Sequence, residues 1–245
     1  MCKMKRIIII GATSGIGREV AKLYIARGWQ VGVAGRRTDE LENLRQEAPQ
    51  QVYTETIDVT HDDAPTRLQS LIDKVGGMDI FLLSSGIGKQ NPTLEADIEL
   101  RTASTNVTGF IRMTMTAYHF FEKQGYGHIA AISSIAGTKG LGIAPAYSAT
   151  KCFQNTYLDA LDQLAHMNGL NICFTDIRPG FVATPLLKDD SYPLLMKAPD
   201  VAAQIVKGID RKKRTLIIDW RYRILVFFWR LIPRCIWLRL KCVKN

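Results

Sequence analysis

Short apolar, β-branched runs alternate with helical stretches from the start of the chain to residue 218. The apolar runs predict strands near 5–10, 30–34, 51–57, 78–84, 127–133, 171–177 and 214–218. Helices are predicted between them, near 15–27, 39–47, 63–75, 95–124, 146–167 and 199–209. Apolar strands alternating with helices are typical of a parallel sheet covered on both faces. We therefore expect an α/β, doubly wound Rossmann fold with seven parallel strands and a ligand crevice at their carboxyl ends.

Length and composition limit the number of domains. The chain has 245 residues, of which 47% are hydrophobic and 22% charged, without internal repeats or low-complexity runs. This length suits one large α/β core and is too short for two. We interpret residues 1–219 as one domain and residues 220–245 as a basic, aromatic tail.

The cysteines and the N-terminus bear on the cellular compartment. The five cysteines are scattered, without a CxxC pair or a histidine cluster at ligand spacing. This pattern favours a reducing cytosol and predicts no metal. The apolar run near the N-terminus extends only from Ile7 to Ile10, so it predicts a first strand and not a signal peptide. The cysteines are Cys2, Cys152, Cys173, Cys235 and Cys242.

A glycine-rich turn directly follows the first predicted strand. The backbone N–H groups and the helix dipole at such a turn favour a pyrophosphate. The order of strand, turn and helix therefore predicts a dinucleotide site, with a tight structural turn as the alternative. The residues assigned to this site are Gly11, Thr13, Ser14, Gly15, Ile16 and Gly17.

The end of the second predicted strand indicates which dinucleotide binds. Arg36 and Arg37 stand where an NAD-binding domain usually carries an acid for the ribose hydroxyls. Arginines there can bind a 2′-phosphate, so NADP(H) is favoured over NAD(H). Asp39 is the competing acid, but at a predicted helix start it complements the dipole instead. Asp58-Val59 ends the third strand and is placed to contact the adenine, with a turn-forming aspartate as the alternative.

Tyr147 and Lys151 lie four residues apart on a predicted helix and therefore share one face. An ammonium beside a phenol stabilises the phenolate electrostatically. A free tyrosine titrates near pH ~10, and moving its pKa to about 7 takes roughly 4 kcal/mol, which Lys151 and a cationic nicotinamide can supply together. Tyr147 is thus the candidate acid and base of a nicotinamide-dependent oxidoreductase.

From about Lys5 to Ile218 the chain resembles the short-chain dehydrogenase/reductase family, in its single-domain form with a YxxxK motif. Five of the family's motifs occur in order along the chain. They are the glycine turn after Ile10, Asn106 in Thr105-Asn106-Val107-Thr108-Gly109, Ser134 thirteen residues before the tyrosine, Tyr147 with Lys151, and the segment Arg178-Pro179-Gly180-Phe181-Val182-Ala183-Thr184.

The resemblance implies a role for each motif. Tyr147 would protonate the carbonyl oxygen as hydride arrives, and Ser134 would hydrogen-bond the same oxygen. Lys151 would hold the nicotinamide ribose and keep Tyr147 acidic, while Asn106 would seat a water that connects the lysine to solvent. Taken singly, these residues are also explained as a helix-surface pair, a strand-end hydroxyl and a helix-interior amide. The remaining cofactor contacts would be Gly86, Pro179, Gly180, Val182 and Thr184, with Thr184 at the carboxamide.

Two positions depart from the family pattern. Ser84-Ser85-Gly86 replaces Asn-Ala-Gly after the fourth strand, and Ile10 replaces a threonine before the first glycine. Gly86 still permits close approach of the cofactor, whereas the usual polar link between these strand ends lacks its side chains. The length excludes the extended branch of sugar epimerases and dehydratases.

Residues 181–199 are predicted to form a lid over an apolar ketone, aldehyde or secondary alcohol. Core or interface packing is the alternative for the lid leucines, and delivery of the substrate on a carrier protein stays open. The family resemblance also implies a homodimer or homotetramer that pairs through the helices at 95–124 and 146–167. The apolar residues concerned are Leu186, Leu187, Tyr192, Leu194, Leu195 and Met196 in the lid and Leu141, Ile143 and Ala144 before Tyr147.

The basic excess of the chain lies at its C-terminus. From Ile205 onward there are 12 Lys and Arg against 2 acids, which accounts for the whole net charge of +9. The longest uncharged run in the tail, Ile224 to Trp229, is too short to span a bilayer. A helix there, broken at Pro233, would carry a basic stripe on an apolar body. The stripe comprises Arg223, Arg230, Arg234 and Lys241.

This tail predicts peripheral contact with the anionic inner face of a membrane. Docking on the domain or on another subunit is the alternative, and nucleic-acid binding is not expected. For the whole chain, the sequence predicts a cytoplasmic NADP(H)-dependent oxidoreductase. The alternative is a nucleotide-sensing or scaffold protein, against which the full catalytic set argues because a sensor needs no proton donor.

Overall fold

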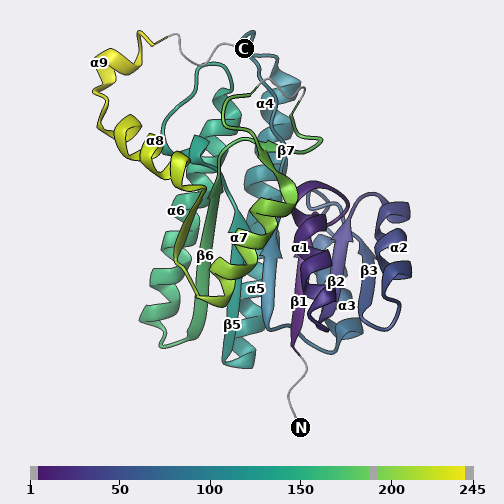
Figure 1. Ribbon diagram of the computed structural model, residues 1–245. Coiled ribbons are helices and arrows are strands. Elements are labelled where there is room, and N and C mark those ends of the chain that lie inside the picture. The colour runs from purple at the N-terminus through teal and green to yellow at the C-terminus, as the bar shows by residue number, and fades with distance from the viewer. Residues whose placement is uncertain (1–4, 188–191, 241–245) are drawn as a thin grey trace.

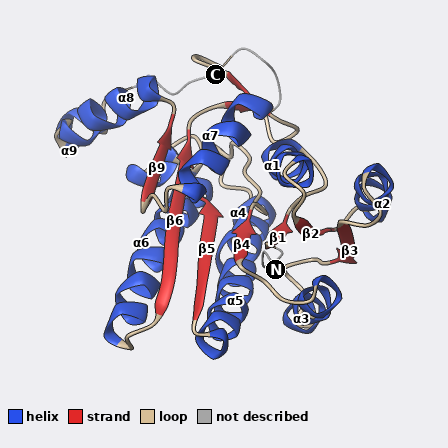
Figure 2. Cartoon of the chain, turned by 60° about the horizontal axis from the view of Figure 1, so that its bottom comes forward, coloured by secondary structure: helices blue, strands red, loops and turns tan. Residues whose placement is uncertain are grey.

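The computed structural model describes residues 5–187 and 192–240. Their central element is a parallel sheet with the strand order β3-β2-β1-β4-β5-β6-β9, in red in Figure 2. The seven-stranded, doubly wound α/β fold predicted from the hydrophobic pattern is therefore confirmed. The strands are β1 (Arg6–Ile10), β2 (Gln30–Gly35), β3 (Val52–Thr56), β4 (Ile80–Leu83), β5 (Tyr126–Ile132), β6 (Asn171–Pro179) and β9 (Thr215–Ile218).

Helices cover both faces of this sheet because its strands are apolar on both sides. Along β1, Ile7 and Ile9 enter one core layer, whereas Ile8 and Ile10 enter the other. The first layer packs under α1 (Gly15–Ala26), α2 (Thr38–Glu47) and α7 (Ala198–Asp210). The second packs under α3 (Ala64–Val75), α5 (Phe110–Gln124) and α6 (Pro145–Met167).

The prediction of one continuous helix over 95–124 is wrong. Helix α4 (Ala96–Ala103) passes into a π-helical turn, η1 (Ser104–Gly109), before α5 begins. A Cβ on Gly109 would lie only 2.6 Å from the Cγ2 atom of Val59, so the widened turn rests closely on the segment after β3. Such π turns are frequent at functional sites, and this one carries Asn106.

The predicted lid contains a small sheet of its own. Strands β7 (Val182–Ala183) and β8 (Met196–Lys197) pair in parallel, with Val182 opposite Met196. Met196 belongs to the core beneath α7, so its interpretation as a substrate-covering residue is wrong. Residues 188–191 of the predicted lid lie outside the described residues.

The tail forms two helices beside the edge strand β9. Asp219 caps α8 (Trp220–Leu231) by accepting a hydrogen bond from the Arg221 N–H at 2.9 Å. Pro233 then separates α8 from the short α9 (Arg234–Trp237), so the predicted break is confirmed. Both helices extend outward from the body, in yellow in Figure 1. Within the described residues, no helix combines the length and apolarity required to cross a membrane.

Candidate active site

Helix α6 carries Tyr147 and Lys151 on its first two turns. The helix begins with Pro145, whose fixed φ suits the first helical position. Glu99 on α4 accepts a hydrogen bond from the Ala146 N–H at 3.0 Å. A carboxylate there satisfies a free donor and complements the helix dipole. Glu99, which the sequence analysis missed, therefore fixes the start of the helix just ahead of Tyr147.

The Lys151 ammonium is buried between α6 and the end of β5. Its Nζ donates to the Ile132 carbonyl at 2.9 Å and to Gln154 Oε1 at 3.0 Å. It also lies 5.8 Å from the centroid of the Tyr147 ring. Burial lowers the pKa of Lys151 to about 8, and the negative charge of Asp176 opposes that shift. The ammonium is thus mostly charged at neutral pH and close to the phenol.

Tyr147 rests against the backbone of the loop after β4. A Cβ on Gly88 would lie 2.5 Å from the ring atom Cδ2, so only a glycine leaves room for this ring position. Burial raises the pKa of Tyr147, and the neighbouring Ser134 hydroxyl opposes the shift. The phenol is therefore in its proton-donating form at neutral pH. The role of Gly88 was not predicted, because nothing in the sequence pattern indicates which backbone meets the ring.

Asn106, on the π turn, is held on all sides. Its Oδ1 accepts from the Ile87 N–H at 2.9 Å, and its Nδ2 donates to the Ile87 carbonyl and to Thr150 Oγ1. Its backbone carbonyl accepts from Gln154 Nε2 at 2.9 Å. Because Gln154 also accepts from Lys151, its side-chain amide joins the Asn106 backbone to the lysine.

Ser134 lies at the carboxyl end of β5, where its Oγ accepts from the Ala136 N–H at 3.1 Å and starts a short 3₁₀ turn, η2 (Ile135–Thr138). The adjacent Ser133 donates to Asp176, a fully buried carboxylate on β6. Arg178 pairs with the same carboxylate through Nε at 2.7 Å. A buried charge of this kind needs such partners.

Asn155 connects this buried network to the catalytic helix. In the amide orientation that satisfies its neighbours, it donates to Asp176 Oδ2 at 3.1 Å and to the Lys151 carbonyl at 3.3 Å. Asp176 and Asn155 were missed by the sequence analysis, although an aspartate inside an apolar strand was a usable signal.

The glycine turn is crowded in a way that permits no side chains. A Cβ on Gly17 would lie 2.3 Å from the Gly11 carbonyl oxygen, and one on Gly11, whose φ is +88°, would lie 2.6 Å from the Ser85 nitrogen. Ser14 makes no side-chain cap on α1, and the first turn of that helix carries no acid. The N–H groups at this helix start are therefore open to an anion. These residues fit the pyrophosphate of a nicotinamide dinucleotide.

Arg37 lies beside this turn, and Arg36 lies beside Asp58. Arg37 Nη2 donates to Thr13 Oγ1 at 2.9 Å and to Ser14 Oγ at 2.7 Å. Arg36 is 69% exposed and has an Nη1 atom 3.9 Å from Asp58 Oδ2. The structure therefore brings two guanidinium groups to the predicted ribose end of the site.

The acids near the ribose end have other partners. Asp58 Oδ1 accepts from the backbone and the hydroxyl of Thr60 at 3.0 and 2.7 Å, as a turn-forming aspartate does. These hydrogen bonds lower the pKa of Asp58, against the opposing effect of its burial. Asp39 is in the first turn of α2, where it complements the dipole. The Val59 side chain is buried in the second core layer.

The proline-glycine segment meets the glycine turn from the opposite side. The methyl Cγ2 of Thr184 lies 3.1 Å from the place that a Cβ on Gly15 would occupy. Pro179 ends β6, the Gly180 N–H donates to the Ile218 carbonyl at 3.1 Å, and Val182 is buried in β7.

Gly86, after β4, lies beside the catalytic residues. A Cβ on Gly86 would lie 3.4 Å from both Asn106 Oδ1 and Lys151 Nζ. The predicted cofactor and catalytic residues therefore border one continuous region. Ile16, the remaining predicted contact, packs beside the first core layer.

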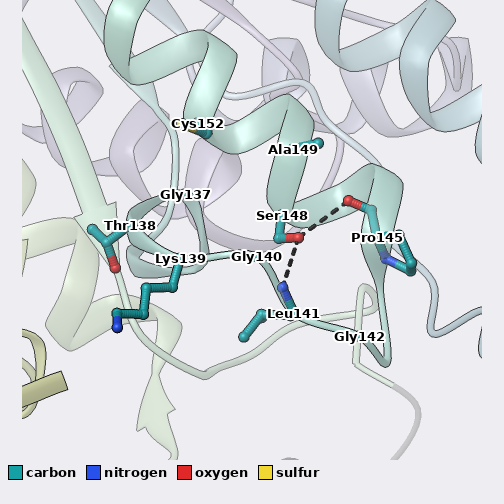
Figure 3. Close-up of a pocket in the computed structure, with 10 residues that line it drawn as sticks. All are labelled: Gly137, Thr138, Lys139, Gly140, Leu141, Gly142, Pro145, Ser148, Ala149 and Cys152. Atoms are coloured by element: carbon teal, nitrogen blue, oxygen red, sulfur yellow. Dashed lines mark hydrogen bonds between the residues drawn. The ribbon is translucent and has the colours of Figure 1, made fainter. Parts of the chain in front are cut away.

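A cavity of about 480 Å³ lies beside this site but on another face of α6. It is lined by residues 137–142 and by Pro145, Ser148, Ala149 and Cys152. These α6 residues lie roughly 100–200° around the helix from Tyr147, so the cavity does not reach the phenol. Figure 3 shows Ser148 Oγ accepting from the Leu141 N–H and donating to the Pro145 carbonyl. Ser148 thereby anchors the loop that precedes Tyr147. Among the described residues, no cluster of three metal-ligating side chains occurs.

Comparison with known proteins identifies the family. A sequence profile of the short chain dehydrogenases matches residues 5–193, well over half of the chain. The chain belongs to the short-chain dehydrogenase family. This short-chain dehydrogenase is 31% identical over 234 residues to an "Uncharacterized oxidoreductase" from Myxococcus xanthus, covering 92% of each chain. It is 27% identical over 237 residues to "Dehydrogenase/reductase SDR family member 7B" from Bos taurus, covering 86% of this chain and 72% of that protein.

Solved structures show the same fold. A 3-ketoacyl-(acyl-carrier-protein) reductase from Brucella melitensis, complexed with NADH, has a TM-score of 0.78 at 24% identity. An alcohol dehydrogenase from the archaeon Thermococcus sibiricus, complexed with 5-hydroxy-NADP, has a TM-score of 0.76 at 21% identity. Each match covers 88% of this chain and 96% of the other. The resemblance stated from the motifs is thus confirmed, and the protein is an oxidoreductase of this family.

Proposed function

We propose that this oxidoreductase uses NADP(H) to interconvert an apolar ketone or aldehyde with its alcohol, with Tyr147 as the general acid and base. The observation that carries the proposal is that three groups lie in one region: the proton-donating phenol of Tyr147, the buried ammonium of Lys151 and the hydroxyl of Ser134 at a strand end. That region is bordered by the crowded glycine turn. A sensor or scaffold would need the turn but not the phenol.

In the reducing direction, the Tyr147 O–H gives its proton to the carbonyl oxygen of the substrate. A reduced nicotinamide held at the glycine turn would supply the hydride. The Ser134 hydroxyl donates to the same oxygen, which stabilises the charge that develops on it. Lys151 stabilises the phenolate left behind, because its pKa of about 8 keeps it charged at neutral pH. Gln154 and Asn106 hold the lysine in place for this role.

The finer parts of the proposal concern cofactor, substrate and assembly. Arg36 and Arg37 favour NADP(H), since a 2′-phosphate would neutralise an exposed guanidinium group with only a long contact to Asp58 and a second one that bonds only neutral hydroxyls. The apolar loop and lid favour an apolar substrate. A homodimer or homotetramer formed through α5 and α6 is an expectation from the family. We also propose a cytoplasmic location, with peripheral membrane contact through the tail.

Replacing Tyr147 with phenylalanine tests the catalytic assignment. We expect turnover with NADPH and a panel of apolar ketones and aldehydes to fall about 10²–10⁴-fold, because the proton donor is lost. NADPH binding, followed by fluorescence titration, should be unchanged. Tyr157→Phe on the same helix is the matched control and should retain turnover. Full activity of Tyr147→Phe would refute the mechanism, and wild-type protein that binds NADPH without any turnover would favour the scaffold alternative.

Replacing Arg36 with alanine tests the cofactor assignment. Because Arg36 is exposed and makes only a long contact with Asp58, its removal should not disturb the fold. We expect the affinity for NADPH to fall about tenfold or more, the loss of one charge-assisted contact, while the affinity for NADH is unchanged. Arg45→Ala, an exposed arginine on α2, is the control. Equal losses for both cofactors would refute the 2′-phosphate assignment.

A further inference from the structure

The tail helices present an unusual amount of apolar surface. Of the sixteen large hydrophobic side chains that are exposed in the described chain, nine lie between residues 220 and 240. An exposed apolar patch of this density marks an interaction site more often than chance exposure does. Six of these nine lie on α8, and five of the six are at least 50% exposed: Trp220, Ile224, Phe227, Phe228 and Leu231.

These five residues form one side of α8, which we call the outer face. At about 100° per residue they fall within a sector of roughly 100°. Tyr222, Val226 and Trp229 lie on the opposite side, where Tyr222 and Val226 are buried against the body. The helix is therefore apolar on two sides, and the fold uses only one of them.

Side-chain contacts tie the two tail helices to the body at several points. Tyr222 Oη accepts from the Phe181 N–H at 3.1 Å, and Trp237 Nε1 donates to the Gly140 carbonyl at 3.0 Å. Lys139 Nζ donates to the Ile232 carbonyl at 2.6 Å and lies 4.9 Å from the Trp237 ring centroid. The outer face is therefore a fixed surface joined directly to the lid and to the loop before Tyr147.

The charges around the outer face identify its partner. Residues 220–240 contain five arginines and no acid. Arg223, Arg230, Arg234 and Arg239 are exposed, and none of them forms an ion pair within the described chain. In a two-fold symmetric contact a surface meets its own copy, so these arginines would face arginines. A membrane surface with anionic headgroups instead accepts both the guanidinium groups and the apolar side chains.

We propose that the outer face of α8, with the arginines of α8 and α9, docks on an anionic lipid surface and so holds the substrate loop and lid at the membrane. This inference deepens the peripheral contact in the proposed function by naming its residues and its lipid chemistry. Because the docked surface is joined to the lid, an apolar substrate dissolved in the bilayer reaches the site without crossing bulk water.

Sedimentation with vesicles tests this inference in the full-length protein. The vesicles are pure phosphatidylcholine or phosphatidylcholine with phosphatidylserine. We expect binding to the anionic vesicles only, weakened by salt. Phe228→Ser/Leu231→Ser should abolish it, and Arg223→Gln/Arg230→Gln should weaken it by about fivefold per charge removed. Leu164→Ser/Met167→Ser and Arg211→Gln/Lys213→Gln are matched controls on other exposed surfaces and should bind as the wild type does.

Three outcomes would overturn the docking surface. The first is that the wild type binds neither kind of vesicle. The second is that the Phe228→Ser/Leu231→Ser variant binds anionic vesicles as well as the wild type does. The third is that the wild type binds no vesicles and is an oligomer in analytical ultracentrifugation, whereas this variant is a monomer. The last outcome would assign the face to a second copy of the chain. NADPH titration of the same samples keeps the two proposals separate, because vesicle binding without nucleotide binding would refute only the proposed function.

Discussion

The Tyr222 hydroxyl joins the tail to residues 181–197, the segment predicted to be a lid, and Tyr222→Phe removes this link alone. The residue is 2% exposed, and its ring packs on Gly180, where a Cβ would lie 2.2 Å from the ring atom Cζ. Its hydroxyl accepts from the Phe181 N–H at 3.1 Å. It donates toward the carbonyls of Pro193 at 2.9 Å and Leu194 at 3.1 Å. Phenylalanine keeps the ring contacts, so the change isolates the hydrogen bonds.

The expected loss follows from counting those bonds. The single phenol proton serves one carbonyl at a time, so the hydroxyl makes two net hydrogen bonds, each worth about 1 kcal/mol. We expect the free energy of unfolding to fall by about 2 kcal/mol, which is a melting temperature lower by roughly 4–8 °C for a domain of this size. If the same loss of about 2 kcal/mol instead affects only the free energy of local opening of the predicted lid, the open form becomes about 30-fold more populated. Proteolysis of the segment 181–197 should then be about 30-fold faster.

Urea denaturation and limited proteolysis measure these two effects. Tyr118→Phe is the control, because the buried Tyr118 hydroxyl has no hydrogen-bond partner among the described residues and its removal should cost nothing. If Tyr222→Phe unfolded within about 0.5 kcal/mol of the wild type and its lid were cleaved no faster, the hydroxyl would not hold the lid.

Three further perturbations act on the site and the core. Gln154→Leu removes an acceptor from the Lys151 ammonium, which should lower the lysine pKa and move the alkaline limb of the kcat/KM profile to lower pH. Gln154→Glu should raise that pKa and move the limb to higher pH. Unchanged profiles would contradict the positioning role of Gln154. Gly88→Ala should lower kcat about 10²-fold by displacing the Tyr147 ring, with NADPH affinity intact. Burial lowers the pKa of His128 from 6.5 to about 4, so between these pH values the unfolded chain binds a proton at His128 and the folded chain does not. Stability should therefore be complete above pH ~6.5 and fall by up to about 3 kcal/mol as the pH drops toward 4, a slope that His128→Gln should remove in urea titrations.

The fold was predictable because its signal is local. Each apolar run of four to seven residues is bounded by glycines or a polar helix start, and right-handed crossovers leave few ways to order the strands. The π turn at Ser104–Gly109 was not predictable in the same way. It depends on the close approach of Gly109 to Val59, a contact between segments far apart in the chain.

The site residues likewise comprise some that local spacing predicts and others that depend on tertiary contacts. Tyr147 and Lys151 share a helix face, so their spacing places them together without knowledge of the fold. Gln154, Asp176 and Gly88 support them from α6, β6 and the loop after β4, and only the tertiary packing shows which group each one contacts. A glutamine three residues after a lysine is ordinary on a helix, and its bond to the Asn106 carbonyl is what gives it a role here.

In the tail, the composition alone does not show which apolar side chains pack on the body and which are exposed, whereas the structure does. The tail's mixture of aromatics and arginines predicted peripheral membrane contact, with docking on the domain or on another subunit as the alternative. The structure assigns the two uses to opposite sides of one helix, because Tyr222 and Val226 face the body while Phe227, Phe228 and Leu231 do not. Inward packing therefore accounts for only part of the apolar content of α8. The outer side chains are not required by the fold, so replacing Phe228 or Leu231 should leave the stability of the domain unchanged, and any effect of these residues must come from what binds the chain.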